Sequence, residues 1–464
     1  MTAVLAELLR DHAWLRDAAL EVCAVGSTAL CEACRRQGLP LPPEPYDVDL
    51  SWRPSPDEGA ALLAERGIEV TATEGAIGRG TLGAKLGRHR VEITTYRGGG
   101  DTTSARVAAD AEHRDMTIGA LYWQLWDDAI ADPTDGIADW KSAVIRSCGA
   151  ADERIREHPI RSVRYLRRAA ELGFSIDSAT RKAVRNNAVS CAAAILPEAL
   201  AEELRRVLER CASPGVFFQL CCEELLLEHL LPEVAPQFDG RPAGRVRWHP
   251  EISQALHMVL ALKTAGTVAD EAQLDAQERV RLMLCVLCHD LGKGTTTAEA
   301  LPSHPGHEAG GVPIIEQLFE RLPSLGSKRT KRLCKVAART HLLLDGLRDL
   351  GNGTLVDLWD EALAPHRQDF ATLARVVRCD QEGRLSTADL GLPERDAPPN
   401  PSTLEHRIHS DLQELDGILA AVSGEESADL FPGDPAGIRS HLRDLRCRTL
   451  AASGFCRNKK ARMS

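Results

Sequence analysis

The strongest constraint on the fold is a change of hydrophobic period along the chain. Residues 24–97 contain short runs in which apolar and polar residues alternate, such as "DVDLSW" and "HRVEITTY". Alternation with a period of two is typical of strands. From about residue 112 almost to the end, helical periodicity replaces it. The chain is therefore predicted to be α+β, with a small mixed head followed by a mostly helical body.

Turn residues and stretches rich in Gly and Pro divide the head and the body further. Residues 1–23 are predicted to form an amphipathic helix, and "AKLGRHRVEITTY" predicts a hairpin with a glycine-containing connection. Stretches rich in Gly and Pro at 237–250 and 392–403 predict linkers. We therefore expect four parts: a head at 1–140, a helical region at 141–240, a further domain at 241–390 and a C-terminal helical segment at 391–464.

Charge and composition exclude some classes of protein. A formal net charge of −11 argues against a non-specific nucleic-acid coat, but it leaves open an enzyme whose cations are concentrated in one channel. Met1–Arg10 has no basic start typical of a secretory signal, and the sequence has no apolar run of 18 residues, so we expect no membrane span. The fourteen scattered cysteines favour reduced thiols and a cytoplasmic location.

Two features of the head could bind a nucleotide and a metal ion. If "PYDVDL" is a strand, Asp47 and Asp49 lie on the same face, where they are either a polar strand edge or a pair of ligands for Mg²⁺. In "VGSTAL", Gly26 and Ser27 follow a short apolar run. This arrangement suits a strand-to-helix turn whose backbone N–H groups can approach phosphate.

Further charged residues follow in order. "RVEITTYR" supplies Glu92 and Arg97 on a predicted strand, and "HRDMTIGALYW" supplies Arg114 and Asp115 at the start of a helix-like run. Three arginines then recur every third residue, near one face of a predicted helix: Arg161, Arg164 and Arg167. They form either a solvated helix face or a nucleotide-binding surface.

Taken in this order, the motifs resemble those of the class II tRNA nucleotidyltransferases, the CCA-adding enzymes. The similarity continues through "DPTDGIADWKSAVIRSCG". The resemblance implies a polymerase-β-like head in which Asp47 and Asp49 are catalytic and hold Mg²⁺. It also implies tRNA, CTP and ATP as partners, with nucleotide contacts from six residues: Gly26, Ser27, Arg114, Arg161, Arg164 and Arg167.

The second part of the chain contains a different motif. "LMLCVLCHDLGKGT" ends an apolar helical run with His289 and Asp290. The spacing resembles the HD phosphohydrolase superfamily, which implies a divalent-metal site completed by His257 upstream and Asp380 downstream. Further candidates near the doublet are His304, His307 and His341. Imidazole and carboxylate ligands suit a transition-metal ion such as Ni²⁺ or Mn²⁺, although a buried His–Asp pair can also exist without metal.

Together the two parts resemble the multifunctional bacterial CCA-adding enzymes. This resemblance implies template-independent addition of C and A to the tRNA 3′ end, together with phosphatase and 2′,3′-cyclic phosphodiesterase activities. Two departures keep other functions open: "VGSTALC" lacks the arginine and aspartate usual in the first motif, and His158 stands in "EHPIR" where an aspartate is usual. The alternatives are an HD phosphohydrolase with a degenerate head, a poly(A) or single-nucleotide transferase, and a non-enzymatic RNA-binding protein. A homodimer also remains open.

Overall fold

The structure is a computed structural model that describes residues 3–44, 48–71, 80–246, 248–385 and 401–457. The chain divides into two compact units, Met1–Ile195 and Leu196–Ser464. We call these unit 1 and unit 2 and describe each by itself. The division of the chain into four parts at residues 140, 240 and 390 stays a prediction.

Unit 1 is built around a mixed seven-stranded sheet of order β3-β4-β5-β2-β1-β6-β7, in which β2 and β5 are parallel and the other neighbours are antiparallel. A second, two-stranded parallel sheet joins β8 to β9. The strands are β1 Cys23–Val25, β2 Asp49–Trp52, β3 Val70–Thr71, β4 Thr81–Leu86, β5 His89–Thr95, β6 Tyr122–Gln124, β7 Ile130–Ala131, β8 Val144–Ile145 and β9 Ser175–Ile176.

Alternating side chains explain the strands. In β4 and β5 the buried residues recur at every second position, as at Leu82 and Ala84 or Val91 and Ile93, so one face of the hairpin packs on the core. The predicted hairpin is confirmed: Leu86 pairs with His89 across its tight connection.

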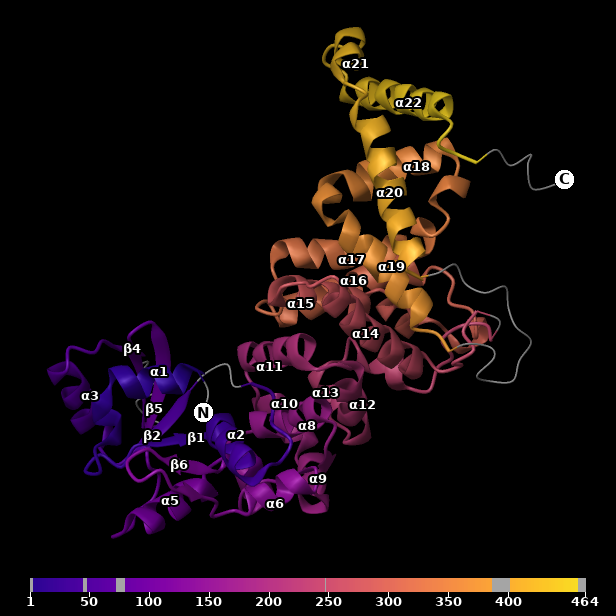
Figure 1. Cartoon of the computed structure of the whole chain (residues 1–464). Coiled ribbons are helices and arrows are strands. Elements are labelled where there is room, and N and C mark those ends of the chain that lie inside the picture. Colours follow the sequence, from indigo (N-terminus) through magenta and orange to yellow (C-terminus); the bar gives the residue numbers. More distant parts are fainter. Residues whose placement is uncertain (1–2, 45–47, 72–79, 247, 386–400, 458–464) are drawn as a thin grey trace. The chain divides into compact units, whose positions relative to one another are not determined.

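The helices of unit 1 cover the sheet and continue past it (Figure 1). They are α1 Ala3–Asp11, α2 Gly26–Gln37, α3 Pro56–Glu65, α5 Thr103–Glu112, α6 Gly136–Lys141, α7 Ala151–Glu157, α8 Ile160–Leu172, α9 Ser178–Asn186 and α10 Ala188–Ala194. Helix α3 begins with the capping box that its sequence encodes, in which Ser55 and Glu58 satisfy each other's backbone N–H groups.

Two local predictions were wrong. The helix expected over residues 1–23 ends at Asp11, because a short 3₁₀ turn at Ala13–Arg16 and strand β1 follow it. The helix-like run after Asp115 is a 3₁₀ turn at Thr117–Gly119 followed by strand β6. Pairing of β6 with β1 outweighs the local helical pattern, because tertiary hydrogen bonds and burial of Tyr122 override weak helix propensity.

The regular elements of unit 2 among its described residues are all helices. Its α-helices are α11 Pro197–Arg210, α12 Gly215–Glu223, α13 Leu227–Leu230, α14 Gln254–Glu271, α15 Ala276–Cys288, α16 His307–Arg321, α17 Lys328–Leu344, α18 Asn352–Leu358, α19 Phe370–Glu382, α20 Pro401–Ala420, α21 Glu425–Leu430 and α22 Pro435–Ser453. Most of the linker predicted at 392–403 lies outside the described residues. The predicted α+β head followed by a mostly helical body is confirmed.

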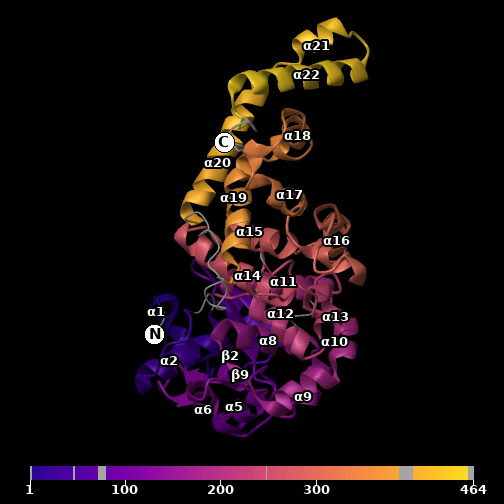
Figure 2. The same cartoon turned by 90° about the vertical axis from the view of Figure 1, so that its right-hand side faces the viewer.

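The core of unit 2 forms where α14, α15, α17 and α19 pack together. The last seven residues of α15, from Leu282 to Cys288, are all buried, as expected for a helix surrounded by others. Helix α20 lies alongside α19 in both views (Figures 1 and 2). These packed helices hold the ends of α15 and α19 in place beside α14.

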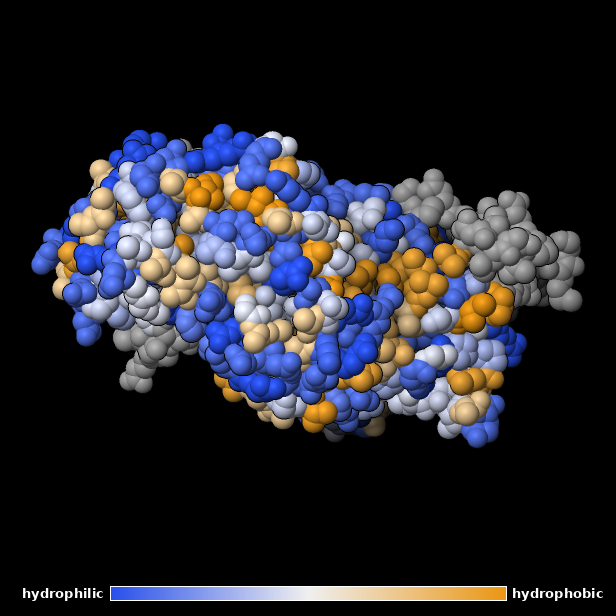
Figure 3. All heavy atoms as spheres, turned by 90° about the horizontal axis from the view of Figure 1, so that it is seen from below, coloured by the Kyte–Doolittle hydropathy of each residue, from blue (hydrophilic) through white to orange (hydrophobic). Residues whose placement is uncertain are grey.

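Within the described residues, no helix combines the length and the apolar composition of a membrane span. The face seen in Figure 3 is largely hydrophilic, with hydrophobic residues between hydrophilic ones and gathered toward one end of the view. Each of the fourteen cysteines is a free thiol.

Candidate functional site

The first candidate site lies on one face of the sheet of unit 1. Asp49 begins β2, and its neighbour across the parallel pair is Glu92 of β5. Residues directly opposite each other in neighbouring strands project to the same side, so the two carboxylates share a face. Asp47 lies outside the described residues. Carboxylate oxygens in such an arrangement are suitable ligands for Mg²⁺.

The turn between β1 and α2 lies next to Asp49. Gly26 has φ +64°, and a Cβ atom added there would stand 3.6 Å from the Asp49 Oδ2 atom. Helix α2 starts at this glycine without a side-chain cap, and Ser27 is partly exposed in its first turn. The first backbone N–H groups of a helix attract anions. The predicted strand-to-helix turn is therefore present, beside the carboxylate.

Arg114 reaches the same sheet from the loop after α5. Its Nη2 atom donates to Ser51 Oγ at 2.6 Å, and Ser51 lies two residues beyond Asp49 on β2, hence on the same face. The guanidinium is held by the buried Asp110, which accepts hydrogen bonds at 2.9 Å and 3.2 Å from it. Arg114 is thus anchored at the sheet by a carboxylate behind it.

Asp110 is the centre of this network, and the sequence interpretation missed it. Its carboxylate also accepts from the backbone N–H and Nε of Arg97 and from the Tyr122 hydroxyl at 2.6 Å. Burial alone would raise the pKa of Asp110, but the guanidinium groups of Arg114 and Arg97 lower it to about 2. The spacing of Asp110 and Arg114, four residues apart across the end of α5, was the signal that could have identified the pair.

The three arginines of α8 have different ion-pair partners. Arg161 Nε and Arg164 Nη1 each lie 2.7 Å from a different oxygen of Asp115. Arg167 is paired with Glu171 at 3.0 Å on its own helix. The structure therefore brings two of the predicted nucleotide-binding arginines together at one carboxylate and pairs the third elsewhere.

The contacts of Asp115 with Arg161 and Arg164 connect α8 to the loop that carries Arg114. Arg161 is nearly buried, and its Nη2 atom also donates to the backbone carbonyl of His113 at 2.7 Å. Burial would raise the pKa of Asp115, but Arg164 and Arg161 hold it below its usual range. His158 is the C-cap residue of α7, and burial together with the charge of Arg161 lowers its pKa. A neutral imidazole is therefore expected there.

The second candidate site lies inside unit 2, and it brings together all four predicted ligands. His257 comes from α14, His289 and Asp290 from the end of α15, and Asp380 from α19. His257 Nε2 is 3.2 Å from Asp380 Oδ1 and 3.5 Å from Asp290 Oδ2, and His289 Nε2 is 3.2 Å from the same Asp290 atom. All four side chains are buried.

Two more of the candidate histidines face the other oxygen of Asp290. His307 Nε2 and His341 Nε2 lie 3.4 Å and 3.7 Å from Asp290 Oδ1. The third, His304, is bound to Thr296 and to the carbonyl of Pro242 instead. The Asp290 carboxylate thus stands between two groups of imidazoles, each with the spacing of a metal-binding cluster.

The ring orientations prepare these histidines to bind a metal ion. The Nδ1 atoms of His289, His307 and His341 each face the backbone carbonyl three residues earlier, at 2.6 Å, 2.7 Å and 3.0 Å. A carbonyl only accepts, so each Nδ1 carries the proton and each Nε2 offers a lone pair. Among the described residues, His257 Nε2, His289 Nε2, His307 Nε2 and Asp290 Oδ1 are buried without a hydrogen-bond partner. This donor set fits a divalent ion.

The charge state of the site also suits a metal. Burial lowers the pKa of His341 to about 4, so this ring is neutral at pH 7. Burial alone would raise the pKa of Asp290, but His289 and Lys293, whose Nζ lies 2.7 Å away, hold it well below its usual range. A neutral imidazole and an ionised carboxylate are the forms that coordinate metal ions.

A glycine allows the second group of histidines to approach the first. Gly292 follows the His289–Asp290 doublet, and a Cβ atom added there would lie 1.9 Å from the His307 carbonyl oxygen. Any larger residue would push α16 away from the end of α15. The "HDLG" sequence therefore supplies the two ligands and also the close contact that brings His307 to Asp290.

Models of two known domains match the chain. The Poly A polymerase head domain matches residues 38–146, and the HD domain matches residues 255–377. Most of each candidate site lies within one match. Asp49, Glu92 and Arg114 lie in the first, and His257, His289 and Asp290 lie in the second. Gly26 and Asp380 lie outside the matched residues.

Solved structures share the fold. The complex of a CCA-adding enzyme with ATP is 15% identical and has a TM-score of 0.61, with 98% of this chain and 93% of that chain covered. The Thermotoga maritima CCA-adding enzyme complexed with tRNA is 14% identical with a TM-score of 0.59, covering 99% and 94%. At these identities the similarity establishes the fold.

A curated relative is closer in sequence. The multifunctional CCA protein of Xanthomonas euvesicatoria pv. vesicatoria (strain 85-10) is 31% identical over 296 residues, which are 63% of this chain and 69% of the relative. The chain belongs to the family of multifunctional CCA proteins.

Proposed function

We propose that the chain is a tRNA nucleotidyltransferase that adds C and A to the tRNA 3′ end from CTP and ATP without a nucleic-acid template. The observation that carries this proposal is the position of Asp49, beside the Gly26 turn and opposite Glu92. Membership of the multifunctional CCA protein family supports it and disfavours the alternatives of a degenerate head or a poly(A) transferase.

Different residues of unit 1 are proposed to bind the metal ion and the phosphates of the nucleotide. Asp47 and Asp49 would hold Mg²⁺, which when bound neutralises the triphosphate and lowers the pKa of an attacking hydroxyl. The backbone N–H groups at Gly26 and Ser27 would hold phosphate oxygens. Arg114 would add a positive charge at the same face, and because Asp110 already fixes its guanidinium, little side-chain entropy is lost on binding.

The arginines of α8 are proposed to contact the nucleotide: Arg161, Arg164 and Arg167. Because Arg161 and Arg164 are held by Asp115, their positions are set before the nucleotide arrives, which favours orientation of the substrate. The reaction joins the tRNA 3′-hydroxyl oxygen to the α-phosphorus of the nucleotide and releases pyrophosphate. RNA would be recognised largely through its shape and backbone.

Unit 2 is proposed to add phosphatase and 2′,3′-cyclic phosphodiesterase activity. His257, His289, Asp290 and Asp380 would hold a transition-metal ion such as Ni²⁺ or Mn²⁺, which when bound activates water for attack on a phosphate ester. His307 and His341 would complete the site through Asp290. A cytoplasmic location and a homodimer remain predictions.

The test of the transferase is incubation of the purified full-length chain with tRNA lacking its 3′ CCA, each labelled nucleotide and Mg²⁺. The wild type should incorporate C and A, whereas Asp49→Ala should not. Asp101→Ala, which removes an exposed aspartate of the same unit, is the matched control and should retain activity. No incorporation by the wild type, or equal incorporation by Asp49→Ala, would refute the proposal.

The phosphodiesterase is tested separately with a 2′,3′-cyclic nucleotide. The pair of substitutions His289→Ala and Asp290→Ala should abolish its hydrolysis while leaving nucleotide addition unchanged. Hydrolysis that survives these substitutions would place the activity outside the cluster in unit 2.

A further inference from the structure

His257 is oriented differently from the other histidines of the metal cluster in unit 2. Backbone carbonyls face the Nδ1 atoms of His289, His307 and His341. His257 Nδ1 instead lies 3.1 Å from Oε1 of the carboxylate of Glu251. The group that sets its orientation is therefore a charged side chain six residues earlier in the chain.

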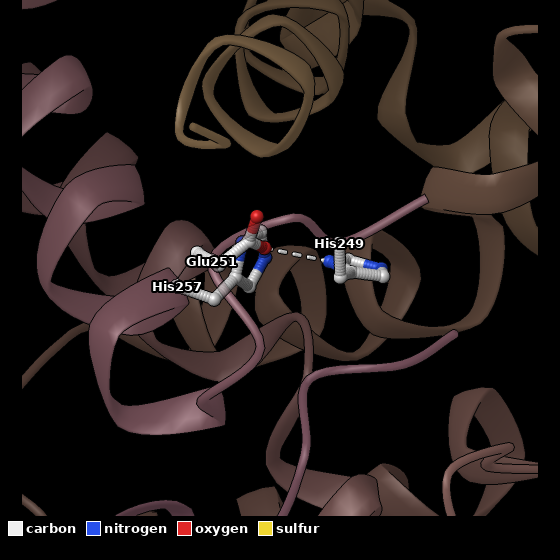
Figure 4. Close-up of side chains that lie close together, drawn as sticks. All are labelled: His249, Glu251 and His257. Atoms are coloured by element: carbon white, nitrogen blue, oxygen red, sulfur yellow. Dashed lines mark hydrogen bonds and ion pairs between the residues drawn. The ribbon is translucent and has the colours of Figure 1, made fainter. Parts of the chain in front are cut away.

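Glu251 is placed for this contact by the loop that precedes α14. It is 4% exposed, and its Oε1 atom also lies within hydrogen-bonding distance of His249 Nδ1, at 2.8 Å. Figure 4 shows the carboxylate between the two imidazole rings. One oxygen thus faces two ring nitrogens, and His249 supports the carboxylate from the side away from α14.

The backbone of this loop is strained next to Glu251. Ile252 has φ +63°, a conformation that is rare for a β-branched residue, and its side chain is 57% exposed. Packing of Ile252 therefore offers little compensation for the strain. Such strained residues persist where the surrounding structure holds them, and they concentrate at functional sites. Here the strained residue links the inward-facing Glu251 to Ser253, the residue that caps α14.

We propose that Glu251 is a positioning residue that orients His257 for binding the metal ion, with His249 holding Glu251 in place. A carboxylate at Nδ1 requires the proton on that nitrogen, so the lone pair of Nε2 faces Asp380 and Asp290. A carboxylate bound to the second nitrogen of a ligating histidine also increases the basicity of the ring. This inference rests on the metal site proposed above.

His249, Glu251 and His257 could themselves form a separate metal site, since their donor atoms lie close together. An ion at His257 Nδ1 would compete with one at Nε2, because binding at both nitrogens requires loss of the ring proton. The geometry favours a carboxylate that supports one centre, 3.1 Å from His257 Nδ1. The two arrangements differ in the number of ions bound, which the experiment measures.

The test is titration of the metal-free, full-length chain with Co²⁺ in competition with a chelator. Glu251→Ala should weaken Co²⁺ binding by about 10- to 100-fold, the usual effect of removing such a partner. Glu251→Gln keeps an accepting oxygen and should weaken binding less. The visible absorption bands of bound Co²⁺ should keep their positions, because the atoms that touch the ion are unchanged.

The matched control is Glu233→Gln. Glu233 is also a buried glutamate of unit 2, and it pairs with Arg321 at the far end of α16 from His307. This substitution should leave Co²⁺ affinity within twofold of the wild type. Thermal unfolding of the metal-free variants checks folding, and Glu251→Gln replaces Glu251→Ala in the comparison if the alanine variant is unfolded.

The outcomes separate the two proposals. A wild type that binds no Co²⁺ would overturn the metal site and this inference with it. Binding by the wild type with an affinity of Glu251→Ala and Glu251→Gln within twofold would overturn the inference alone, as would an equal loss in Glu233→Gln. Loss of one whole equivalent of Co²⁺ in His249→Ala would also refute it, because His249 would then be a ligand.

Discussion

Replacing Asp110 by asparagine should destabilise unit 1 and weaken nucleotide binding together. The substitution keeps the size of the side chain but removes the charge that faces Arg97 and Arg114. Removing one partner of a buried ion pair costs about 3–5 kcal/mol, since the remaining charge stays buried. Because Arg114 loses its anchor, KM for CTP and ATP should rise.

The lowered pKa of Asp110 gives a second, independent value for its contribution to the free energy of unfolding. The pKa of Asp110 falls from an ordinary 3.8 to about 2 on folding, which corresponds to about 2.5 kcal/mol of stability. A lowered pKa stabilises the fold above pH 4, and the contribution is lost as pH falls toward 2. At pH 3 about half should be gone. The free-energy difference between wild type and Asp110→Asn should therefore be about 1 kcal/mol smaller at pH 3 than at pH 7.

The assay is urea unfolding followed by tryptophan fluorescence. Five of the seven tryptophans lie in unit 1, so the signal mainly reports that unit. Asp101→Asn, an exposed aspartate of the same unit, is the control and should change stability by about 0.5 kcal/mol or less. A loss under 1 kcal/mol for Asp110→Asn, or a loss that is the same at pH 3 and pH 7, would refute the assignment of Asp110 as the anchor.

Three further outcomes follow from the two sites. Gly26→Ala should lower kcat/KM for nucleotide addition and cost roughly 1–2 kcal/mol, because φ +64° disfavours a side chain there; a variant as active and stable as the wild type would contradict the role of this turn. Asp290→Asn should abolish metal retention by unit 2, measured by elemental analysis, while nucleotide addition continues; full metal content would count against Asp290 as a ligand. Chelation should stop both activities, with Mg²⁺ restoring addition and Ni²⁺ or Mn²⁺ restoring phosphodiesterase; recovery of both with Mg²⁺ alone would contradict the two-metal assignment.

The metal cluster of unit 2 was the part of the site most accessible from sequence. His289 and Asp290 directly follow an apolar helix, and His257 and Asp380 lie on helices rich in apolar residues, so their elements could be predicted locally. What could not be predicted was the group that faces the Nδ1 atom of each ring. The contact of Glu251 with His257 depends on a loop held in a strained conformation, which no periodicity encodes.

In the head, too, some features were predictable from the sequence and others were not. Alternation predicted the hairpin and placed Asp49 on a strand, but the helix-like pattern after Asp115 was misleading. Strand β6 forms there because β1 offers an unpaired edge and Tyr122 becomes buried against Asp110. Neither the edge nor the buried carboxylate is visible in a window of ten residues.

The sequence by itself determined the α+β head, the helical body and the kinds of ligand at each site, since these depend on the period of neighbouring residues and on side-chain chemistry. Only the tertiary structure decided which polar groups meet: Asp110 with Arg114, Asp115 with Arg161, and Glu251 with His257. The physical reason is that helix and strand periods act over a few residues. The pairing of buried charges depends on how elements pack, and it is decided when burial makes an unpaired charge too costly.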